Sequence, residues 1–208
     1  MPDVTPDPDP FAHFARWLAE AGETEVNDPN AMTLATCTPD GRPSARIVLL
    51  KGVDAPRGVD APDAAPRGFV FYTNLDSRKG AELAANPRVA LLFHWKTRQR
   101  QVRIEGATER VSDAEADAYY ATRARVSRLG AWASEQSRPL GARAELEARV
   151  AAFDAQYPGE AIPRPPYWSG TRVIPARFEF WQDMPFRLHD RIIYAPGDAG
   201  WTTSRLYP

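Results

Sequence analysis

Residues 45–51, with the sequence ARIVLLK, decide the fold of this chain. They form a short, nearly continuous apolar run with a cation near each end, Arg46 and Lys51, which predicts a buried strand that brings two positive charges to one place. Residues 32–38 alternate in the manner of a strand, and residues 39–41 (PDG) form a turn between the two runs. Together the two runs predict a β-hairpin.

A second strand-like stretch, residues 69–80 (FVFYTNLDSRKG), runs into a helix for which Ser77 is a good N-cap. Arg78 and Lys79 then lie in the first helical turn, where the helix dipole disfavours positive charge. Cations are expected there when an anion lies against them, and the free N–H groups of a helix N-terminus bind phosphate. We therefore expect a phosphorylated ligand between this turn and residues 45–51, with a solvated basic turn as the alternative.

The composition is that of an ordinary globular protein and narrows the possible functions. The chain has 208 residues, of which 43% are hydrophobic and 25% charged, and this suits one large domain or at most two small ones. Its net charge is −1 and its basic residues are scattered among acidic ones, so we expect a small anion and no nucleic acid as partner. Cys37 stands alone, and we expect neither a disulfide framework nor a metal site.

The first residues of the sequence show no targeting pattern. No basic segment precedes an apolar one, and no apolar run approaches the roughly 20 residues that span a bilayer. We therefore expect a cytoplasmic protein without a membrane partner. Residues 1–10 place prolines among aspartates and predict a disordered segment ahead of a single domain over residues 11–208.

The rest of the chain predicts more strands than helices. Strands are expected over residues 88–95, 101–110, 172–182 and 192–194, helices after Asp9, Ser77 and Ser112 and over residues 146–157, and an expanded surface loop over residues 52–68. This order predicts a mainly β fold, an antiparallel β-barrel or sheet with peripheral helices. His13 and His94 are expected to be a helix-surface and a strand residue with structural roles.

Tyr119, Arg123 and Ser127 form a second polar group, at helical spacing. A hydroxyl, a guanidinium and a second hydroxyl on one helix face are the donors that suit a phosphate ester. An exposed polar helix face has the same pattern and is the alternative.

A third polar group lies in the run RLHDR at residues 187–191. On a strand, Arg187, His189 and Arg191 would project from one face, with Leu188 on the other. Three groups that carry or can gain positive charge repel one another unless an anion or acidic partners lie among them. With tryptophan and tyrosine as candidate walls for a planar ring, the residues alone predict a binder of planar phosphorylated compounds.

Seven short motifs, taken together in their order along the chain, allow a more specific prediction. They are RIVLLK (46–51), FYTNLDSRK (71–79), NPRV (86–89), RQV (100–102), QS (136–137), EFWQ (179–182) and RLHDR (187–191). Together they resemble the pyridoxine (pyridoxamine) 5′-phosphate oxidase family, from about residue 11 to residue 208. The resemblance implies an FMN-binding split β-barrel that works as a homodimer, with each FMN in a cleft between subunits. It also implies oxidation of pyridoxamine 5′-phosphate or pyridoxine 5′-phosphate to pyridoxal 5′-phosphate, with hydride transfer to FMN and reoxidation by O2 to give H2O2.

The resemblance also assigns roles to residues of this sequence. The FMN contacts that it implies are Arg46, Ile47, Val48, Leu49, Leu50, Lys51, Tyr72, Thr73, Arg78, Lys79, Gln101, Gln136, Ser137, Trp181 and Arg191. The substrate contacts that it implies are Lys51, Tyr119, Arg123 and Ser127 for the phosphate and Arg187, Leu188 and His189 near the ring. Arg187 and His189 are the expected catalytic residues, acting through orientation and electrostatics, because the flavin carries the redox chemistry.

Two features depart from the family pattern. The family has a basic, tyrosine-containing arm before the first helix that folds over the substrate, whereas residues 1–10 here are acidic and proline-rich; residues 52–68 are also longer than the family needs. The alternatives are a sister split-barrel flavin oxidase with another substrate, such as the phenazine-type oxidases, and a non-catalytic binder of FMN or pyridoxal phosphate. The presence of Lys51, Tyr119, Arg123 and Ser127 argues against a sister oxidase with another substrate. The presence of Arg187 and His189 argues against a non-catalytic binder.

Overall fold

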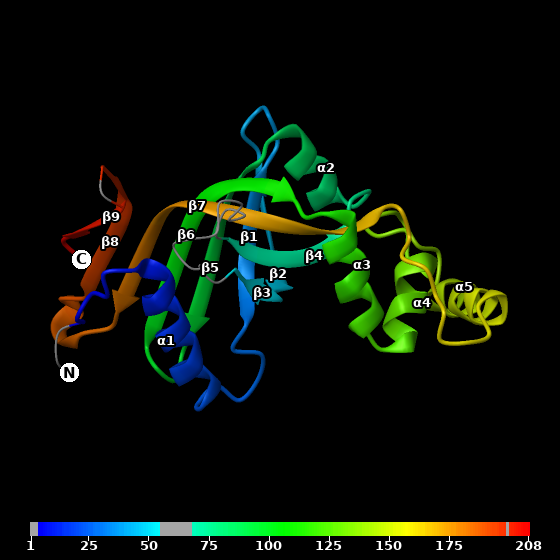
Figure 1. Cartoon of the computed structure of the whole chain (residues 1–208), viewed down its shortest axis with the longest axis horizontal. Helices are drawn as coiled ribbons and strands as arrows, with labels where there is room; N and C mark the ends of the chain where they lie inside the picture. Colours follow the sequence, from blue (N-terminus) through cyan, green and yellow to red (C-terminus); the bar gives the residue numbers. More distant parts are fainter. Residues whose placement is uncertain (1–3, 55–67, 199) are drawn as a thin grey trace.

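The computed structural model describes residues 4–54, 68–198 and 200–208, which form one curled antiparallel sheet with helices packed around it (Figure 1). The elements in chain order are α1 (Pro10–Gly22), β1 (Ala31–Cys37), β2 (Pro43–Leu49), β3 (Gly52–Val53), β4 (Phe69–Asn74), α2 (Arg78–Ala85), β5 (Arg88–Trp95), β6 (Arg100–Arg110), α3 (Asp113–Thr122), α4 (Arg125–Ala133), α5 (Arg143–Gln156), β7 (Trp168–Gln182), the 3₁₀ turn η1 (Pro185–Arg187), β8 (Asp190–Gly197) and β9 (Gly200–Arg205). The predicted mainly β fold with peripheral helices is confirmed.

The long strand β7 holds the sheet together because it pairs along both edges. Its first half pairs with β4 and its second half with β8, while β6 runs along its other edge. The register between β6 and β7 shifts at Gly106, where a Cβ atom would lie 2.1 Å from the carbonyl oxygen of Ile174. Only glycine permits this bulge, and the bulge bends the two strands so that one sheet curls into a half-barrel.

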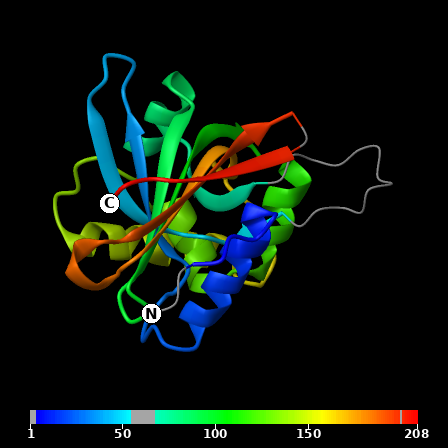
Figure 2. The same ribbon diagram turned by 90° about the vertical axis from the view of Figure 1, so that its left-hand side faces the viewer.

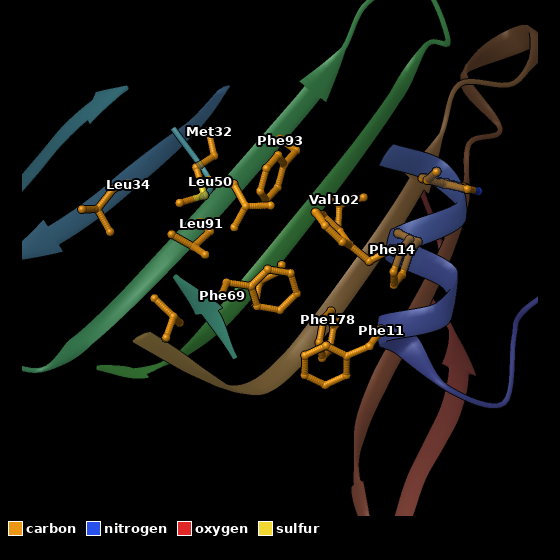
Figure 3. Packing of buried hydrophobic residues seen from close by; sticks show 14 of the residues in the cluster. Phe11, Phe14, Met32, Leu34, Leu50, Phe69, Leu91, Phe93, Val102 and Phe178 are labelled. Carbon is orange, nitrogen blue, oxygen red and sulfur yellow. The ribbon is translucent and has the colours of Figure 1, made fainter. Parts of the chain in front are cut away.

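The core fills the space between the sheet and α1 (Figure 3). The predicted start of α1 is confirmed, since the Asp9 side chain accepts a hydrogen bond from the Phe11 N–H and Pro10 is the first helical residue. Phe14 is fully buried, and its ring lies 4.9 Å from the rings of both Phe69 and Phe93. Aromatic residues of one amphipathic helix therefore close the half-barrel.

His13 lies on this buried face, so the prediction of a helix-surface residue is wrong. Its ring stacks on Phe180 with centroids 3.9 Å apart, and its Nδ1 lies 2.9 Å from the Tyr194 hydroxyl. Burial lowers the pKa of His13 to about 4, and the imidazole is therefore neutral at physiological pH. His94 is an exposed residue of β5, as a strand position allows.

The hairpin of β1 and β2 is confirmed, but residues 45–51 are not a buried strand. β2 is an edge strand of the sheet, and Ile47 on it is 65% exposed. Leu50 is the buried member of the run, at 5% exposure. An apolar run on a sheet edge indicates a surface that another chain covers.

Three other predictions need correction. Gly52 and Val53 form β3 and not loop, and the remainder of the predicted loop, residues 55–67, lies outside the described residues. Residues 119–127 are not one helix, because Arg123 is the extended C-cap of α3 and α4 begins at Arg125. Arg187 is not on a strand either, since it ends η1 with a φ of 61°.

The N-terminal residues lie against the C-terminal strands. The Val4 N–H donates to the Asp190 carboxylate at 2.8 Å, and the Asp7 N–H donates to the Tyr194 hydroxyl at 3.0 Å. β8 and β9 form a hairpin at the end of the molecule nearest the viewer in Figure 2, a pairing that the sequence did not predict for β9. That residues 1–10 are disordered and residues 11–208 a single domain stays a prediction. Within the described residues, no helix is long and apolar enough to cross a membrane.

Candidate functional site

A cavity of about 770 Å³ lies between β2, β4, α2, α3 and α4. Arg46, Lys51 and Lys79, from the two stretches predicted to hold a phosphate, meet there with Tyr119, Arg123 and Ser127. This volume is typical of cofactor and substrate sites. The residues that line it are Arg46, Ile47, Val48, Leu49, Lys51, Tyr72, Thr73, Asn74, Lys79, Tyr119, Arg123, Ala124, Ser127, Gly130, Ala131, Ser134, Gln136 and Trp168.

A buried carboxylate, Glu82 of α2, holds one end of the cavity in place. Its side chain is 4% exposed and accepts hydrogen bonds from Ser44 Oγ at 2.6 Å, Arg78 Nε at 2.9 Å and Arg46 Nη2 at 3.1 Å. Burial alone would raise the pKa of Glu82, but these donors and Thr36 outweigh burial and lower it to about 2. Glu82 therefore stays ionised and fixes the guanidinium of Arg46 at the cavity wall.

Because the folded-state pKa of Glu82 lies below its ordinary value of 4.5, its ionisation stabilises the fold at neutral pH and stops doing so as the pH falls from 4.5 to 2. The difference corresponds to about 3 kcal/mol of unfolding free energy across that range. We expect urea unfolding of Glu82→Gln to show about 1 kcal/mol less loss of stability between pH 6 and pH 3.5 than the parent protein. An equal loss in both proteins would contradict this assignment.

The first turn of α2 adds a second cation to the same end of the cavity. Ser77 caps the helix as predicted, its Oγ accepting from the Gly80 N–H at 3.3 Å. Lys79 Nζ donates to Gln136 Oε1 at 2.9 Å, and burial and the nearby Arg46 lower the pKa of Lys79. An anion between the two cations would relieve this repulsion.

Aromatic rings form the opposite wall. Tyr72, Tyr119 and Trp168 form a cluster of nearly parallel rings, with centroids 3.9 Å apart for Tyr72 and Tyr119, 5.2 Å for Tyr72 and Trp168 and 6.2 Å for Tyr119 and Trp168. Arg123 lies over the Trp168 ring at 4.7 Å, and its buried Nη1 has no hydrogen-bond partner among the described residues. Burial lowers the pKa of Arg123. A buried guanidinium N–H is rarely left unpaired, so this donor indicates a place for an anionic ligand.

The third polar group lies elsewhere, in η1, the turn that follows it and the start of β8, beside β7. Trp181 is the strand partner of both Gln101 and Arg191. The buried carboxylate of Glu179 accepts from Arg191 Nε at 2.8 Å and from Arg103 Nη2 at 2.6 Å. Figure 1 shows this part of β7 and β8 at the end of the molecule opposite α3 and α4.

His189 is oriented by the turn in which it lies. Its Nδ1 lies 2.9 Å from the Asp183 carboxylate and 3.3 Å from the Met184 N–H. Nδ1 accepts the hydrogen bond from the Met184 N–H, so the turn holds the ring through this nitrogen and leaves Nε2 for another partner. Phe186 and Arg187 both have φ near +60°, a strained conformation for residues with side chains that proteins use mainly at functional sites.

The structure thus divides the predicted site residues into two groups and leaves four aside. The cavity contains Arg46, Ile47, Val48, Leu49, Lys51, Tyr72, Thr73, Lys79, Gln136, Tyr119, Arg123 and Ser127, whereas Gln101, Trp181, Arg187, His189 and Arg191 lie at the other end of the sheet. Leu50 is in the core, Arg78 is bound to Glu82, and Ser137 and Leu188 are exposed outside the cavity. The roles of all these residues stay predictions.

Sequence reasoning missed Glu82, Trp168 and Glu179. The spacing of four between Arg78 and Glu82 is a helical ion-pair signal that could have pointed to the first. Trp168 had no local signal, and Glu179 was noted only as part of the motif EFWQ, because their partners Arg123 and Arg103 are remote in sequence.

The curled antiparallel sheet and its cationic, aromatic-lined cavity define a protein of the split β-barrel class. Residues 18–157 match the family model described as pyridoxamine 5′-phosphate oxidase, and residues 168–208 match that of the pyridoxine 5′-phosphate oxidase C-terminal dimerisation region. The chain belongs to the pyridoxamine 5′-phosphate oxidase family.

Relatives agree over nearly the whole chain. The pyridoxine/pyridoxamine 5′-phosphate oxidase of Rhodospirillum rubrum is 64% identical, with 97% of this chain and 98% of the relative covered. That of Gluconobacter oxydans is 60% identical, with coverage of 96% and 94%. Among solved structures, PhzG from Burkholderia lata, in complex with tetrahydrophenazine-1-carboxylic acid, has a TM-score of 0.87 at 34% identity, covering 98% of this chain and 94% of its own.

Proposed function

We propose that the protein oxidises pyridoxamine 5′-phosphate and pyridoxine 5′-phosphate to pyridoxal 5′-phosphate, with FMN as cofactor and O2 as the final acceptor. The observation that carries this proposal is the cavity lined by two sets of cations, Arg46 with Lys79 and Lys51 with Arg123, whose buried Nη1 has no hydrogen-bond partner among the described residues. A flavin phosphate and a substrate phosphate would each meet one of them.

The residues present fit FMN. Arg46 and Lys79 would hold its phosphate at the N-terminus of α2, where their mutual repulsion calls for an anion. The edge strand β2 would lie along the ring system through residues 47–49, which line the cavity. When bound, FMN supplies the hydride acceptor and the reaction with O2.

The protein's own task is to bind and orient the substrate. Arg123, Tyr119, Ser127 and Lys51 would bind its phosphate, which fixes one end of the molecule. Arg187 and His189 would hold the pyridine ring, with the orientation of the imidazole set by Asp183. Correct placement of two reacting groups contributes much of the rate of such a reaction.

We further propose that two chains build each site in a homodimer. The cavity and the Arg187–His189 turn lie at opposite ends of one chain, so a single chain does not bring them to one substrate (Figure 1). The exposed edge strand β2 beside the cavity and the match of residues 168–208 to a dimerisation region both support this arrangement.

The alternatives are less well supported. A phenazine-type oxidase is represented by PhzG, which is 34% identical, whereas the relatives named pyridoxine/pyridoxamine 5′-phosphate oxidase reach 64%. A non-catalytic binder would not need the ordered His189 and the strained Arg187 turn.

The test is aerobic turnover by the purified protein with added FMN. We expect pyridoxamine 5′-phosphate to yield pyridoxal 5′-phosphate with one O2 consumed and one H2O2 formed per product, because the flavin transfers two electrons. Pyridoxine 5′-phosphate is the second substrate to be measured. If neither compound consumes O2 while FMN is bound, the proposed function is wrong.

Gly80→Ala is expected to weaken FMN binding at least about tenfold. A Cβ at this position would lie 2.0 Å from the carbonyl oxygen of Leu75, a backbone atom, so the first turn of α2 must shift and move Lys79. Quenching of flavin fluorescence on titration of the apoprotein measures this. Gly22→Ala is the matched control, since its Cβ meets nothing within 4 Å, and it should leave FMN affinity unchanged.

A further inference from the structure

Arg172 of β7 lies outside the cavity, yet three carboxylates from three different elements converge on its guanidinium. Asp54, just after β3, meets Nε at 2.5 Å; Glu109 of β6 meets Nη1 at 3.2 Å; and Glu115 of α3 meets Nη2 at 2.9 Å. The Arg172 side chain is only 9% exposed, whereas the three carboxylates reach it from partly exposed positions.

The first of these carboxylates connects Arg172 to Lys51. The Lys51 N–H donates to the Val70 carbonyl at 2.8 Å, and Val70 of β4 is the strand partner of Arg172. Gly52, which directly follows Lys51, therefore lies in one row across the sheet with Val70 and Arg172. Asp54 follows Lys51 by three residues, and its N–H donates to the Gly68 carbonyl at 3.0 Å. The bond from Arg172 to Asp54 thus fixes the segment that carries Lys51.

The third carboxylate connects Arg172 to Tyr119 and Arg123. Glu115 precedes Tyr119 by four residues in α3, so both project from the same face of that helix. Arg123 is the C-cap at the end of the same helix. The bond from Arg172 to Glu115 thus fixes how α3 docks on the sheet beside Tyr72.

We propose that Arg172 is a positioning residue that sets the separation between Lys51 on one side of the substrate phosphate and Tyr119 with Arg123 on the other. The inference rests on the proposed function, because it concerns the phosphate of that substrate. A planar guanidinium suits this task, since its fork binds several carboxylates in fixed directions, which a lysine ammonium does not.

The three carboxylates supply a matched set of variants. Asp54→Asn and Glu115→Gln each weaken a bond from Arg172 to a segment that carries a proposed phosphate-binding residue. Glu109→Gln weakens a bond to the same guanidinium, but β6, which carries Glu109, contributes no proposed phosphate-binding residue. We expect the first two to raise KM for pyridoxamine 5′-phosphate about tenfold with kcat and FMN affinity within about twofold. The inhibition constant of inorganic phosphate should rise by the same factor, while Glu109→Gln changes neither quantity.

Arg172→Lys completes the test, since it keeps the charge and removes the fork. It should raise KM and the phosphate inhibition constant at least as much as Glu115→Gln does, with unchanged FMN affinity. Equal effects of Glu109→Gln and Glu115→Gln, or a loss of kcat and FMN affinity together, would show a merely structural role and overturn the proposal. If the parent protein oxidises no substrate, the proposed function fails separately, and calorimetric titration of the same variants with pyridoxamine 5′-phosphate decides the positioning role by the same comparison.

Discussion

Arg123→Met is expected to raise KM for pyridoxamine 5′-phosphate about 100-fold, with a much smaller change in kcat. Within the part of the chain that the structure describes, the buried Arg123 Nη1 has no hydrogen-bond partner, and the guanidinium lies at the end of α3 over Trp168. A hydrogen bond to a charged group contributes about 1.5–3 kcal/mol, and a phosphate would accept from this donor. Methionine keeps an unbranched apolar side chain at this position and removes the charged head that lies over Trp168.

Steady-state kinetics with the FMN-loaded protein measure this effect. Arg143→Met is the matched control, because Arg143 is an exposed residue of α5 that pairs with Glu147 and does not line the cavity. It should behave as the parent protein. An unchanged KM in Arg123→Met would remove Arg123 from the phosphate site, and loss of FMN binding instead would assign Arg123 to the cofactor.

Two heterodimers that carry the same two substitutions are expected to differ about 50-fold in activity. In one, each chain carries one substitution; in the other, one chain carries both and its partner carries neither. Arg123→Met impairs the cavity, and Arg187→Met impairs the turn that would face it from the other chain. We expect each change alone to leave about 1% of the activity at low substrate concentration, since each removes one charged contact to the substrate.

With one defect on each chain, one of the two sites in the dimer is intact, and about half of the activity should remain. With both defects on one chain and a normal partner, each site has one defect, and about 1% should remain. Two affinity tags allow either heterodimer to be purified. If each site were built by a single chain, the two results would be exchanged.

Much of the fold could be predicted because its signals are local. The turn between β1 and β2, the Asp9 and Ser77 caps and the alternation of β6 depend on residues that are neighbours in sequence. The fold class followed from the order of these elements. β9 was missed because most of its residues are exposed, and its sequence therefore has no alternating apolar pattern.

Features that depend on remote contacts could not be predicted. The apolar run at residues 45–51 is typical of a buried strand, but its place at a sheet edge is a property of the strand order. The break between α3 and α4 at Arg123 has no proline or glycine to signal it. The separation of the site residues into two groups depends on the path of β7, which pairs with β4 at one end and with β8 at the other. No local sequence pattern reports that path.

The most direct test of the account is anaerobic mixing of the FMN-loaded protein with pyridoxamine 5′-phosphate while the visible absorbance of the oxidised flavin is recorded. We predict that this absorbance bleaches, and that it returns on admission of air with pyridoxal 5′-phosphate in the solution. A protein that binds FMN but keeps its yellow colour with both pyridoxamine 5′-phosphate and pyridoxine 5′-phosphate would contradict the account.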